Sequence, residues 1–448
     1  MYKNKFHFLF SKNKMILDER MKDALIWSLI GQILSRTINL ISTIILARLM
    51  DPEGYGKYIY LIGTLMFFSQ IFSLSIRSTS TRNIAFLISK DKIQAQKYIF
   101  TSLFLGSFFS FFSYLILSLA VYSFQENIVV KEYGLYILLI TFTAIISEIA
   151  QPTILGILEG LKSFKFLNLL TIFISFFKFI LSYFGWVFYN IEGAIIGWVL
   201  ASIIGLFLFF KPLNSSLKHH NINLKGIKYN ECKKEIKLYF NFSIPSSIEA
   251  GILMFSIWII QTFIMDYGNH GKKEIALFNI ANQWRYLIIY LPAILINMTQ
   301  SFFSEFLGQG ADKNAENLFL KIKKFTFIFS ALLIIFFLLI SKWIVKFYGD
   351  GYTDAYIVLI ILIPPVLFTN INALKRQYLM SKGKVWLITI NNLIAGVSII
   401  IFFLIFKNYY SLSISFAISI GLGEIFIYLI YLFIFRNFSL KYLINYKK

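Results

Sequence analysis

Three cationic side chains, Arg36, Lys178 and Arg285, lie inside long apolar stretches of the sequence. A charged side chain near the middle of a membrane-spanning helix costs about 2.5–3.5 kcal/mol on insertion scales, so such a residue usually faces a wet cavity or a partner. Arginine suits phosphate, because its planar fork binds two oxygens at once and never loses its proton. These residues are therefore candidates for binding the phosphates of an anionic ligand, with the two arginines ranked first. For Arg36, a structural ion pair with an acidic neighbour is the alternative.

Polar residues gather on one face of each helix that carries an arginine. At about 100° per residue, Gln32 and Asn39 fall on the same side of their helix as Arg36. A second set falls within an arc of roughly 100°, with Arg285 about 60° beyond it. The members of this second set are Asn279, Asn282, Gln283, Tyr286, Tyr290 and Asn297. A lipid-facing helix would not concentrate so many hydrogen-bonding groups on one side. Both faces are therefore predicted to line a cavity and to contact the polar part of a ligand.

Three carboxylates also lie in apolar stretches, at Glu148, Glu249 and Glu424. Carboxylates in such positions can bind Na⁺ or a proton and couple transport to an ion gradient. They can equally form ion pairs with the cations of neighbouring helices. The sequence leaves both interpretations open.

The composition is that of a membrane protein. The chain has 448 residues, of which 58% are hydrophobic, and its mean hydropathy is +0.70. Since a soluble domain cannot bury so much apolar surface, we predict an all-α polytopic membrane protein. We attribute the net charge of +21 to Lys and Arg in cytoplasmic loops and expect no binding to nucleic acid. We expect no resident cofactor or metal and no enzymatic activity. The chain has a single cysteine, no histidine in any predicted span and no Walker-type glycine loop.

About twelve apolar stretches approach the ~20 residues needed to cross a bilayer. They cover residues 24–49, 56–77, 98–124, 133–158, 165–189, 191–210, 241–265, 275–303, 324–345, 353–373, 385–406 and 411–435. These transmembrane helices are expected to form two six-helix lobes around a central cavity, as in transporters built from parallel repeats. The predicted regions are a cytoplasmic N-terminal tail (1–23), a first lobe (24–210), a cytoplasmic linker (211–240), and a second lobe with a short cytoplasmic tail (241–448).

The loops predict the orientation. Lys and Arg concentrate in the termini, in the linker and in the loops on the same side of the membrane. The positive-inside rule therefore places both termini and the linker in the cytoplasm. Cys232 lies in this linker, and we expect a membrane-impermeant thiol reagent to reach it from the cytoplasmic side only.

Two segments resemble a known family. They are ILARLMDPEGYGKYIYL at 45–61 and LFNIANQWRYLIIYLPAILINMTQSFFSEF at 277–306. Both resemble the polysaccharide transporters of the multidrug/oligosaccharidyl-lipid/polysaccharide exporter superfamily, in particular the Wzx-type flippases of O-antigen and capsule repeat units. The family's Ala-Arg-x-Leu-Gly-Pro-x-Gly-Tyr-Gly pattern is matched by Ala47, Arg48, Leu49, Pro52, Gly54, Tyr55 and Gly56. Its Gly-x-Tyr-Asn-x-Ala pattern is matched in part, by Leu277, Phe278, Asn279 and Ala281. Asp51 departs from the first pattern, since it stands where glycine is usual.

The resemblance implies a flippase that moves undecaprenyl-diphosphate-linked oligosaccharide repeat units from the cytoplasmic to the outer leaflet of the cytoplasmic (inner) membrane. It would work by alternating access between the two lobes, in the assembly of surface polysaccharide such as O-antigen or capsule. Arg36, Arg285 and Lys178 would then bind the diphosphate, and the polar faces would contact the sugar. The implied partners are the lipid-linked oligosaccharide and membrane lipids. A polysaccharide polymerase, a chain-length regulator, and coupling to Na⁺ or H⁺ stay open.

Two other functions fit the sequence less well. A cation-coupled multidrug exporter of the same superfamily would need acidic residues to attract cationic drugs, whereas the first and eighth spans carry arginine. A membrane glycan polymerase would usually have a large outer loop, and an acyltransferase would need a catalytic histidine within a span. The predicted spans and outer loops provide neither.

Overall fold

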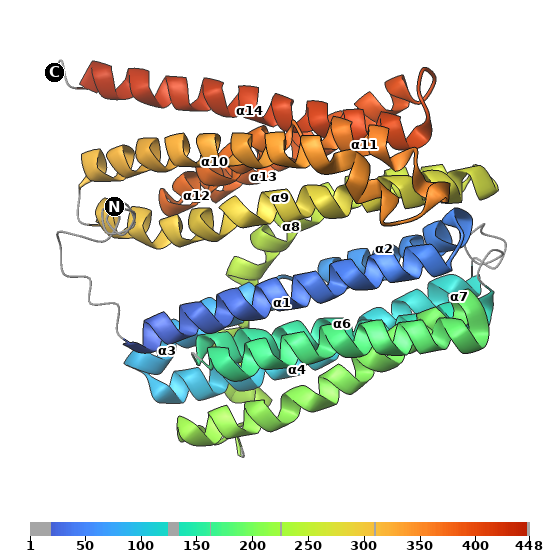
Figure 1. Ribbon diagram of the computed structural model, residues 1–448. Coiled ribbons are helices and arrows are strands. Elements are labelled where there is room, and N and C mark those ends of the chain that lie inside the picture. Colours follow the sequence, from blue (N-terminus) through green and yellow to red (C-terminus); the bar gives the residue numbers. More distant parts are fainter. Residues whose placement is uncertain (1–18, 124–133, 162, 225, 309–310, 446–448) are drawn as a thin grey trace.

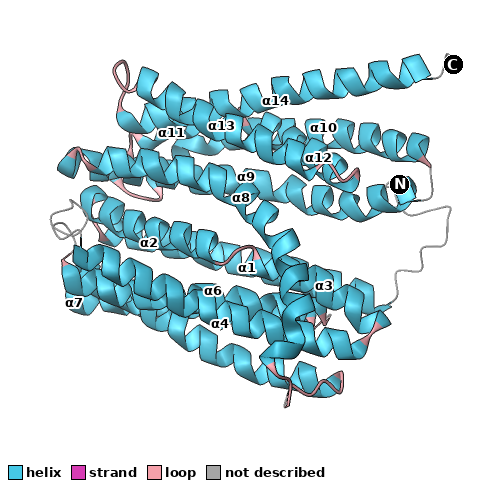
Figure 2. Ribbon diagram, turned by 180° about the vertical axis from the view of Figure 1, so that it is seen from behind, coloured by secondary structure: helices cyan, strands magenta, loops and turns pink. Residues whose placement is uncertain are grey.

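The computed structural model describes residues 1–448 except for 1–18, 124–133, 162, 225, 309–310 and 446–448. Within these described ranges the chain is helical and contains no strand (Figure 2). The helices of the first half are α1 (Glu19–Leu49), α2 (Pro52–Phe72), α3 (Ile76–Lys90), α4 (Lys92–Ser123), α6 (Leu135–Gly160) and α7 (Phe164–His219). Those of the second half are η2 (Tyr229–Cys232), α8 (Lys233–Met265), α9 (Gly268–Gly308), α10 (Asp312–Lys346), η3 (Asp350–Tyr352), α11 (Ala355–Leu362), α12 (Val366–Ser381), α13 (Val385–Phe406) and α14 (Leu412–Asn445).

The helices form two lobes that lie side by side (Figure 1). The first lobe contains α1 to α7, drawn in blue to green, with α6 packed against both α4 and α7 and α1 lying along α7. The second lobe contains α9 to α14, drawn in yellow to red, with α13 on α14 and α9 on α12. Helix α8 crosses between them. Its start packs into the core of the first lobe through Tyr239, and its later part runs along α13.

Seven described helices are long and apolar enough to cross a membrane, or nine if each of two bent pairs counts as one span. The bent pairs are α2 with α3 and α11 with α12, each with an angle of 41°. Helix α7 is interrupted, because Tyr189 and Asn190 leave the helical backbone conformation and Asn190 has a φ of 51°. Counting each bent pair once and dividing α7 at this break gives twelve helical segments in the described chain, six from α1 to α7 and six from α8 to α14 when the crossing helix α8 is counted with the second half.

The predicted linker is shorter in the structure than the sequence suggests. Helix α7 continues to His219, and α8 begins at Lys233, so only residues 220–232 lie between the two helices. Cys232 is 1% exposed and packs against the start of α4, with its sulfur 4.0 Å from the carbonyl oxygen of Lys97. Burial also raises the pKa of the Cys232 thiol. The expectation that Cys232 is an accessible topology probe is therefore wrong, because a protonated and buried thiol reacts poorly.

The turn between α1 and α2 explains the departure at Asp51. Its carboxylate caps α2 by accepting a hydrogen bond of 2.9 Å from the backbone N–H of Gly54, and Pro52 occupies the first turn of the helix. Aspartate is among the best residues for this capping position, and proline fits the first turn because its missing N–H is not needed there. The capped turn fixes where α2 begins.

The backbones of the two lobes meet near the start of α2 and of α9, on the right of Figure 1. A Cβ atom added to Gly56 would lie 1.8 Å from the carbonyl oxygen of Lys272. Only glycine allows two backbones to come so near. Close by, the hydroxyl of Tyr352 donates to the carbonyl oxygens of Ala47 and Met50, at 2.8 and 3.1 Å. We call this meeting of residues 47–56 with Lys272 and residues 347–352 the closing contact.

Replacing Gly56 should separate the lobes at the closing contact. We expect Gly56→Ala to lengthen the distance between spin labels at Phe188, in the first lobe, and Tyr267, at the start of the second, measured by electron–electron double resonance. The matched control is Gly63→Ala on the same helix, where the nearest atom to an added Cβ lies at an ordinary 3.6 Å. Equal distances in the two variants would contradict the role assigned to Gly56.

Candidate binding cavity

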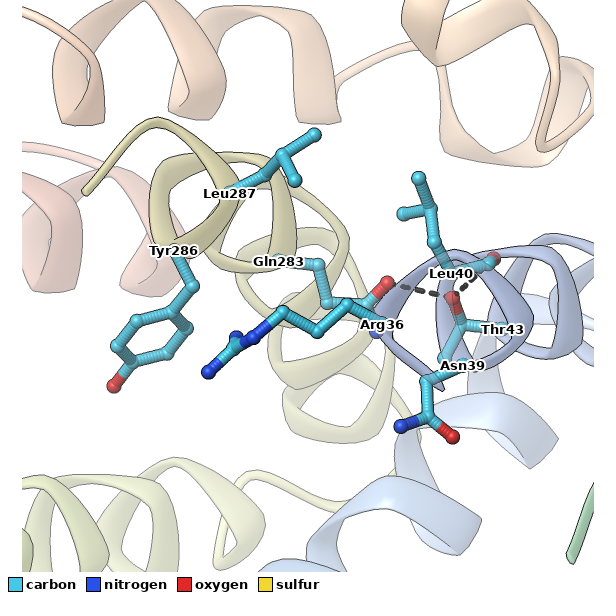
Figure 3. A pocket seen from close by; sticks show the side chains of 7 residues that line it. All are labelled: Arg36, Asn39, Leu40, Thr43, Gln283, Tyr286 and Leu287. Carbon is cyan, nitrogen blue, oxygen red and sulfur yellow. Dashed lines mark hydrogen bonds between the residues drawn. The ribbon is translucent and has the colours of Figure 1, made fainter. Parts of the chain in front are cut away.

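A cavity of about 150 Å³ lies between α1 of the first lobe and α9 of the second (Figure 3). It is lined by Arg36, Asn39, Leu40, Thr43, Gln283, Tyr286 and Leu287. Among these described lining residues Arg36 alone carries a charge. The polar side chains come from both helices, as the periodicity of the sequence predicts. The cavity can therefore offer hydrogen bonds to a polar ligand and one fixed positive charge to an anion.

A chain of hydrogen bonds joins the two sides of the cavity. The hydroxyl of Thr43 on α1 lies 2.7 Å from Oε1 of Gln283 on α9 and donates to it. The amide of Gln283 in turn donates to the hydroxyl of Tyr55 on α2, at 3.2 Å. Tyr55 is fully buried and belongs to the segment that makes the closing contact. The polar lining is thus connected directly to the place where the lobes meet.

Arg36 reaches from α1 across the face of α9 toward Tyr286 (Figure 3). The carbon at the centre of its guanidinium lies 3.8 Å from the ring centre of Tyr290, and the hydroxyl of Tyr290 donates to Oε1 of Gln32. No described carboxylate lies within ion-pair distance of Arg36, and the side chain is exposed. Stacking on the tyrosine ring therefore holds the guanidinium in place while its N–H groups stay available.

Lys178 lies away from this cavity, inside the first lobe. Its ammonium makes an ion pair of 2.7 Å with Glu148, and that carboxylate also accepts a 3.0 Å hydrogen bond from Ser202. The ring centre of Trp198 lies 4.1 Å from the lysine nitrogen. Both ionic side chains are less than one-fifth exposed. The structure thus brings one candidate cation and one candidate coupling carboxylate together as a pair that joins α6 to α7.

Arg285 points into the second lobe and is 5% exposed. Its guanidinium contacts Glu424 on α14 at 3.4 Å and donates to the Asn282 side chain at 3.2 Å. Glu424 also accepts a 3.2 Å hydrogen bond from Asn372 on α12. The guanidinium carbon of Arg285 lies 5.7 Å from the ring centre of Tyr286, and Tyr286 lines the cavity. Arg285 therefore sits behind the cavity wall.

The remaining predicted residues are divided between the cavity and its surroundings. Asn279 uses its amide within its own helix, donating to the carbonyl oxygen of Ile275 at 2.9 Å. The side chains of Glu249 and Asn297 fall outside the described residues. Sequence reasoning did not select Thr43 as a site residue, although it shares the polar stripe of α1 and the same periodicity could have identified it.

No family model matches the sequence, and no curated protein matches it either. Solved structures do match. One is an inward-facing multidrug resistance MATE family transporter of the MOP superfamily, with a TM-score of 0.74 and 15% identity, covering 91% of this chain and 95% of that one. An outward-facing structure of such a transporter gives a TM-score of 0.70 at 15% identity, covering 93% and 96% of the two chains.

A third similar structure is a MOP superfamily transporter from Pyrococcus furiosus, described as having a binding pocket of reverse polarity that suggests a different function. It gives a TM-score of 0.67 at 15% identity and covers 92% of this chain and 93% of that one. Together these matches confirm the predicted fold class, an all-α polytopic membrane protein with two six-helix lobes.

The Lys178–Glu148 pair yields a stability prediction. Glu148→Gln leaves a buried ammonium without its partner and should lower the free energy of unfolding by about 3–5 kcal/mol. The double variant Glu148→Gln/Lys178→Met removes both charges and should recover most of this loss. Thermal unfolding of the detergent-solubilised variants measures the effect. A single variant as stable as the wild type would show that the pair does not stabilise the first lobe.

Proposed function

We propose that this chain is a flippase that carries undecaprenyl-diphosphate-linked oligosaccharide repeat units from the cytoplasmic to the outer leaflet, for O-antigen or capsule assembly. The observation that carries the proposal is the charge of the cavity. Among the described residues its one charged lining residue is Arg36, which has no described carboxylate beside it and is surrounded by amide and hydroxyl groups. A guanidinium held in this way can bind an anionic diphosphate with two parallel hydrogen bonds. Asn39, Gln283 and Tyr286 would then contact the sugar.

The size of the cavity supports a mechanism in which the lobes must separate. A pocket for a drug-sized ligand holds about 300–1,000 Å³, whereas this cavity holds about 150 Å³. It has room for a phosphate group and not for an oligosaccharide. An oligosaccharide would therefore fit only after the lobes separate. In the proposed direction of transport it would enter from the cytoplasmic side while the closing contact seals the outer side. Release to the outer leaflet would require the closing contact to open.

A cation-coupled multidrug exporter is the second candidate, favoured by the structural likeness to multidrug resistance transporters. A cationic drug would have to enter beside Arg36, which repels it. The similar structure from Pyrococcus furiosus is described as having a binding pocket of reverse polarity that suggests a different function, so this fold is not tied to one polarity of pocket. The charge of the lining therefore favours the anionic lipid over the cationic drug.

We also propose the membrane, the orientation and the partners of the protein. The membrane would be the cytoplasmic one, with both termini inside, and the partners would be the lipid-linked cargo, membrane lipids and, at a later step, a polymerase and a chain-length regulator. Of the candidate coupling carboxylates, Glu148 and Glu424 each lie beside a cation. A coupling ion, Na⁺ or H⁺, would therefore have to compete with Lys178 or Arg285 for its site.

Arg36 provides the direct test of this function. Arg36→Ala should lower the rate at which reconstituted protein moves a fluorescent lipid-diphosphate oligosaccharide by about tenfold or more, since losing a charged hydrogen bond costs roughly 1.5–3 kcal/mol. Arg36→Lys keeps the charge without the fork and should retain part of the activity. Thr37→Ala, the next residue of the same helix and outside the lining, is the matched control. Wild-type rates in Arg36→Ala would remove this residue from the cargo site.

The orientation can be tested with introduced cysteines in a Cys232→Ser background. Ser215 is exposed in the last turns of α7, and Tyr409 is 76% exposed between α13 and α14. A membrane-impermeant thiol reagent applied to intact cells should label Tyr409→Cys and spare Ser215→Cys until the membrane is permeabilised. The opposite pattern would invert the proposed topology and the direction of transport with it.

A further inference from the structure

Lys375 lies inside the second lobe, although the sequence places it in a cytoplasmic loop. Helix α12 continues past the predicted end of its span, and the Lys375 side chain is 2% exposed. Its ammonium reaches the carbonyl oxygen of Tyr428 at 3.5 Å and lies 3.8 Å from the centre of that ring. The ring centre of Tyr431 is 5.8 Å away. None of the described carboxylates is within ion-pair distance of this ammonium. A buried cation without an anion is costly.

A carboxylate stands one helical turn away. Tyr428 follows Glu424 by four residues on α14, so the two lie on the same face, about 6 Å apart along the axis. On α12, Asn372 precedes Lys375 by three residues and donates to both the backbone oxygen and the side chain of Glu424, at 3.0 and 3.2 Å. The packing of α12 on α14 therefore already sets Lys375 and Glu424 in register. A change of lysine side-chain rotamer could join them.

The present partner of Glu424 holds it loosely. The Arg285–Glu424 contact is 3.4 Å long, whereas a charge-assisted hydrogen bond between nitrogen and oxygen measures about 2.7–2.9 Å. The other buried pair, Lys178–Glu148, has the short distance of 2.7 Å. In addition, Nε of Arg285 is buried and has no hydrogen-bond partner in the described chain. Arg285 thus has unused capacity for an anionic oxygen and lies directly behind Tyr286, which lines the cavity.

We propose that Glu424 exchanges its counter-ion during transport, from Arg285 in the cargo-free state to Lys375 in the loaded state. The inference rests on the proposed function, since the diphosphate of the cargo is the anion that draws Arg285 away. Without cargo, Arg285 holds the carboxylate of Glu424, and Lys375 has no described carboxylate beside it. With cargo, Arg285 pairs with the diphosphate and Lys375 pairs with Glu424. Binding of the anion then gives Arg285, Lys375 and Glu424 each a partner of opposite charge. The ion pair that joins α9 to α14 is replaced by one that joins α12 to α14.

The test is binding of undecaprenyl diphosphate to the full-length protein in nanodiscs. In Lys375→Met, releasing Arg285 strands Glu424, so the dissociation constant should rise by about tenfold or more. Lys375→Arg keeps a cation and should bind nearly as the wild type does. Lys375→Met/Glu424→Gln frees Arg285 altogether and should restore binding. This recovery by a second substitution measures the coupling between the two residues, which damage to the fold would not reproduce.

Lys321→Met is the matched control, since it removes an exposed lysine of helix α10. Thermal unfolding without ligand checks that each variant is folded. Equal affinity of Lys375→Met and the wild type would overturn the exchange and leave the proposed function intact, and so would a double variant that binds no better than Lys375→Met. Failure of the wild type to bind undecaprenyl diphosphate would overturn the proposed function, and the exchange with it.

Discussion

The cost of an unpaired charge in the membrane interior governs the arrangement of the polar residues in this protein. In the described chain each lobe contains a buried ion pair, Lys178 with Glu148 in the first and Arg285 with Glu424 in the second. Arg36 is exposed and has no carboxylate beside it in the part of the chain that the structure describes, and it stacks on Tyr290 at the edge of a cavity. The same physical rule thus separates cations that hold a lobe together from one that is available to a ligand.

The closing contact connects this electrostatic arrangement to motion. Gly56 lets the backbones of α2 and α9 meet, and Tyr55 beside it is linked through Gln283 to Thr43 in the cavity lining. A ligand that competes for Gln283 would therefore act on the residues that hold the lobes together. The proposed alternating access would require such a connection, because a ligand shifts a conformational equilibrium only through contacts that differ between the states.

The sequence predicts features that depend on a single helix. Apolar length gives the twelve-helix, two-lobe fold, and helical periodicity places Arg36 and Asn39 of α1 on one face and Gln283 and Tyr286 of α9 on another. These four residues do line one cavity. The periodicity of one helix contains no information about the neighbour that faces it, so the sequence could not decide whether Lys178 and Arg285 meet a ligand or a carboxylate. Glu424 lies 139 residues from Arg285 along the chain. The apolar stretch that predicts a span ends at residue 373, before Lys375, whereas packing against α14 lets α12 continue past it to Ser381.

The central claim is that the cavity between α1 and α9 receives a lipid-linked glycan, and photo-crosslinking in living cells tests it most directly. Leu40 lines the cavity, whereas its neighbour Ile41 is exposed and lies outside the lining. With benzoyl-phenylalanine at Leu40, irradiation should capture a lipid-diphosphate oligosaccharide, identified by mass spectrometry of the adduct, and the same label at Ile41 should capture membrane lipid only. Capture of the glycan from both positions alike, or from neither while the cells accumulate lipid-linked glycan, would contradict the account.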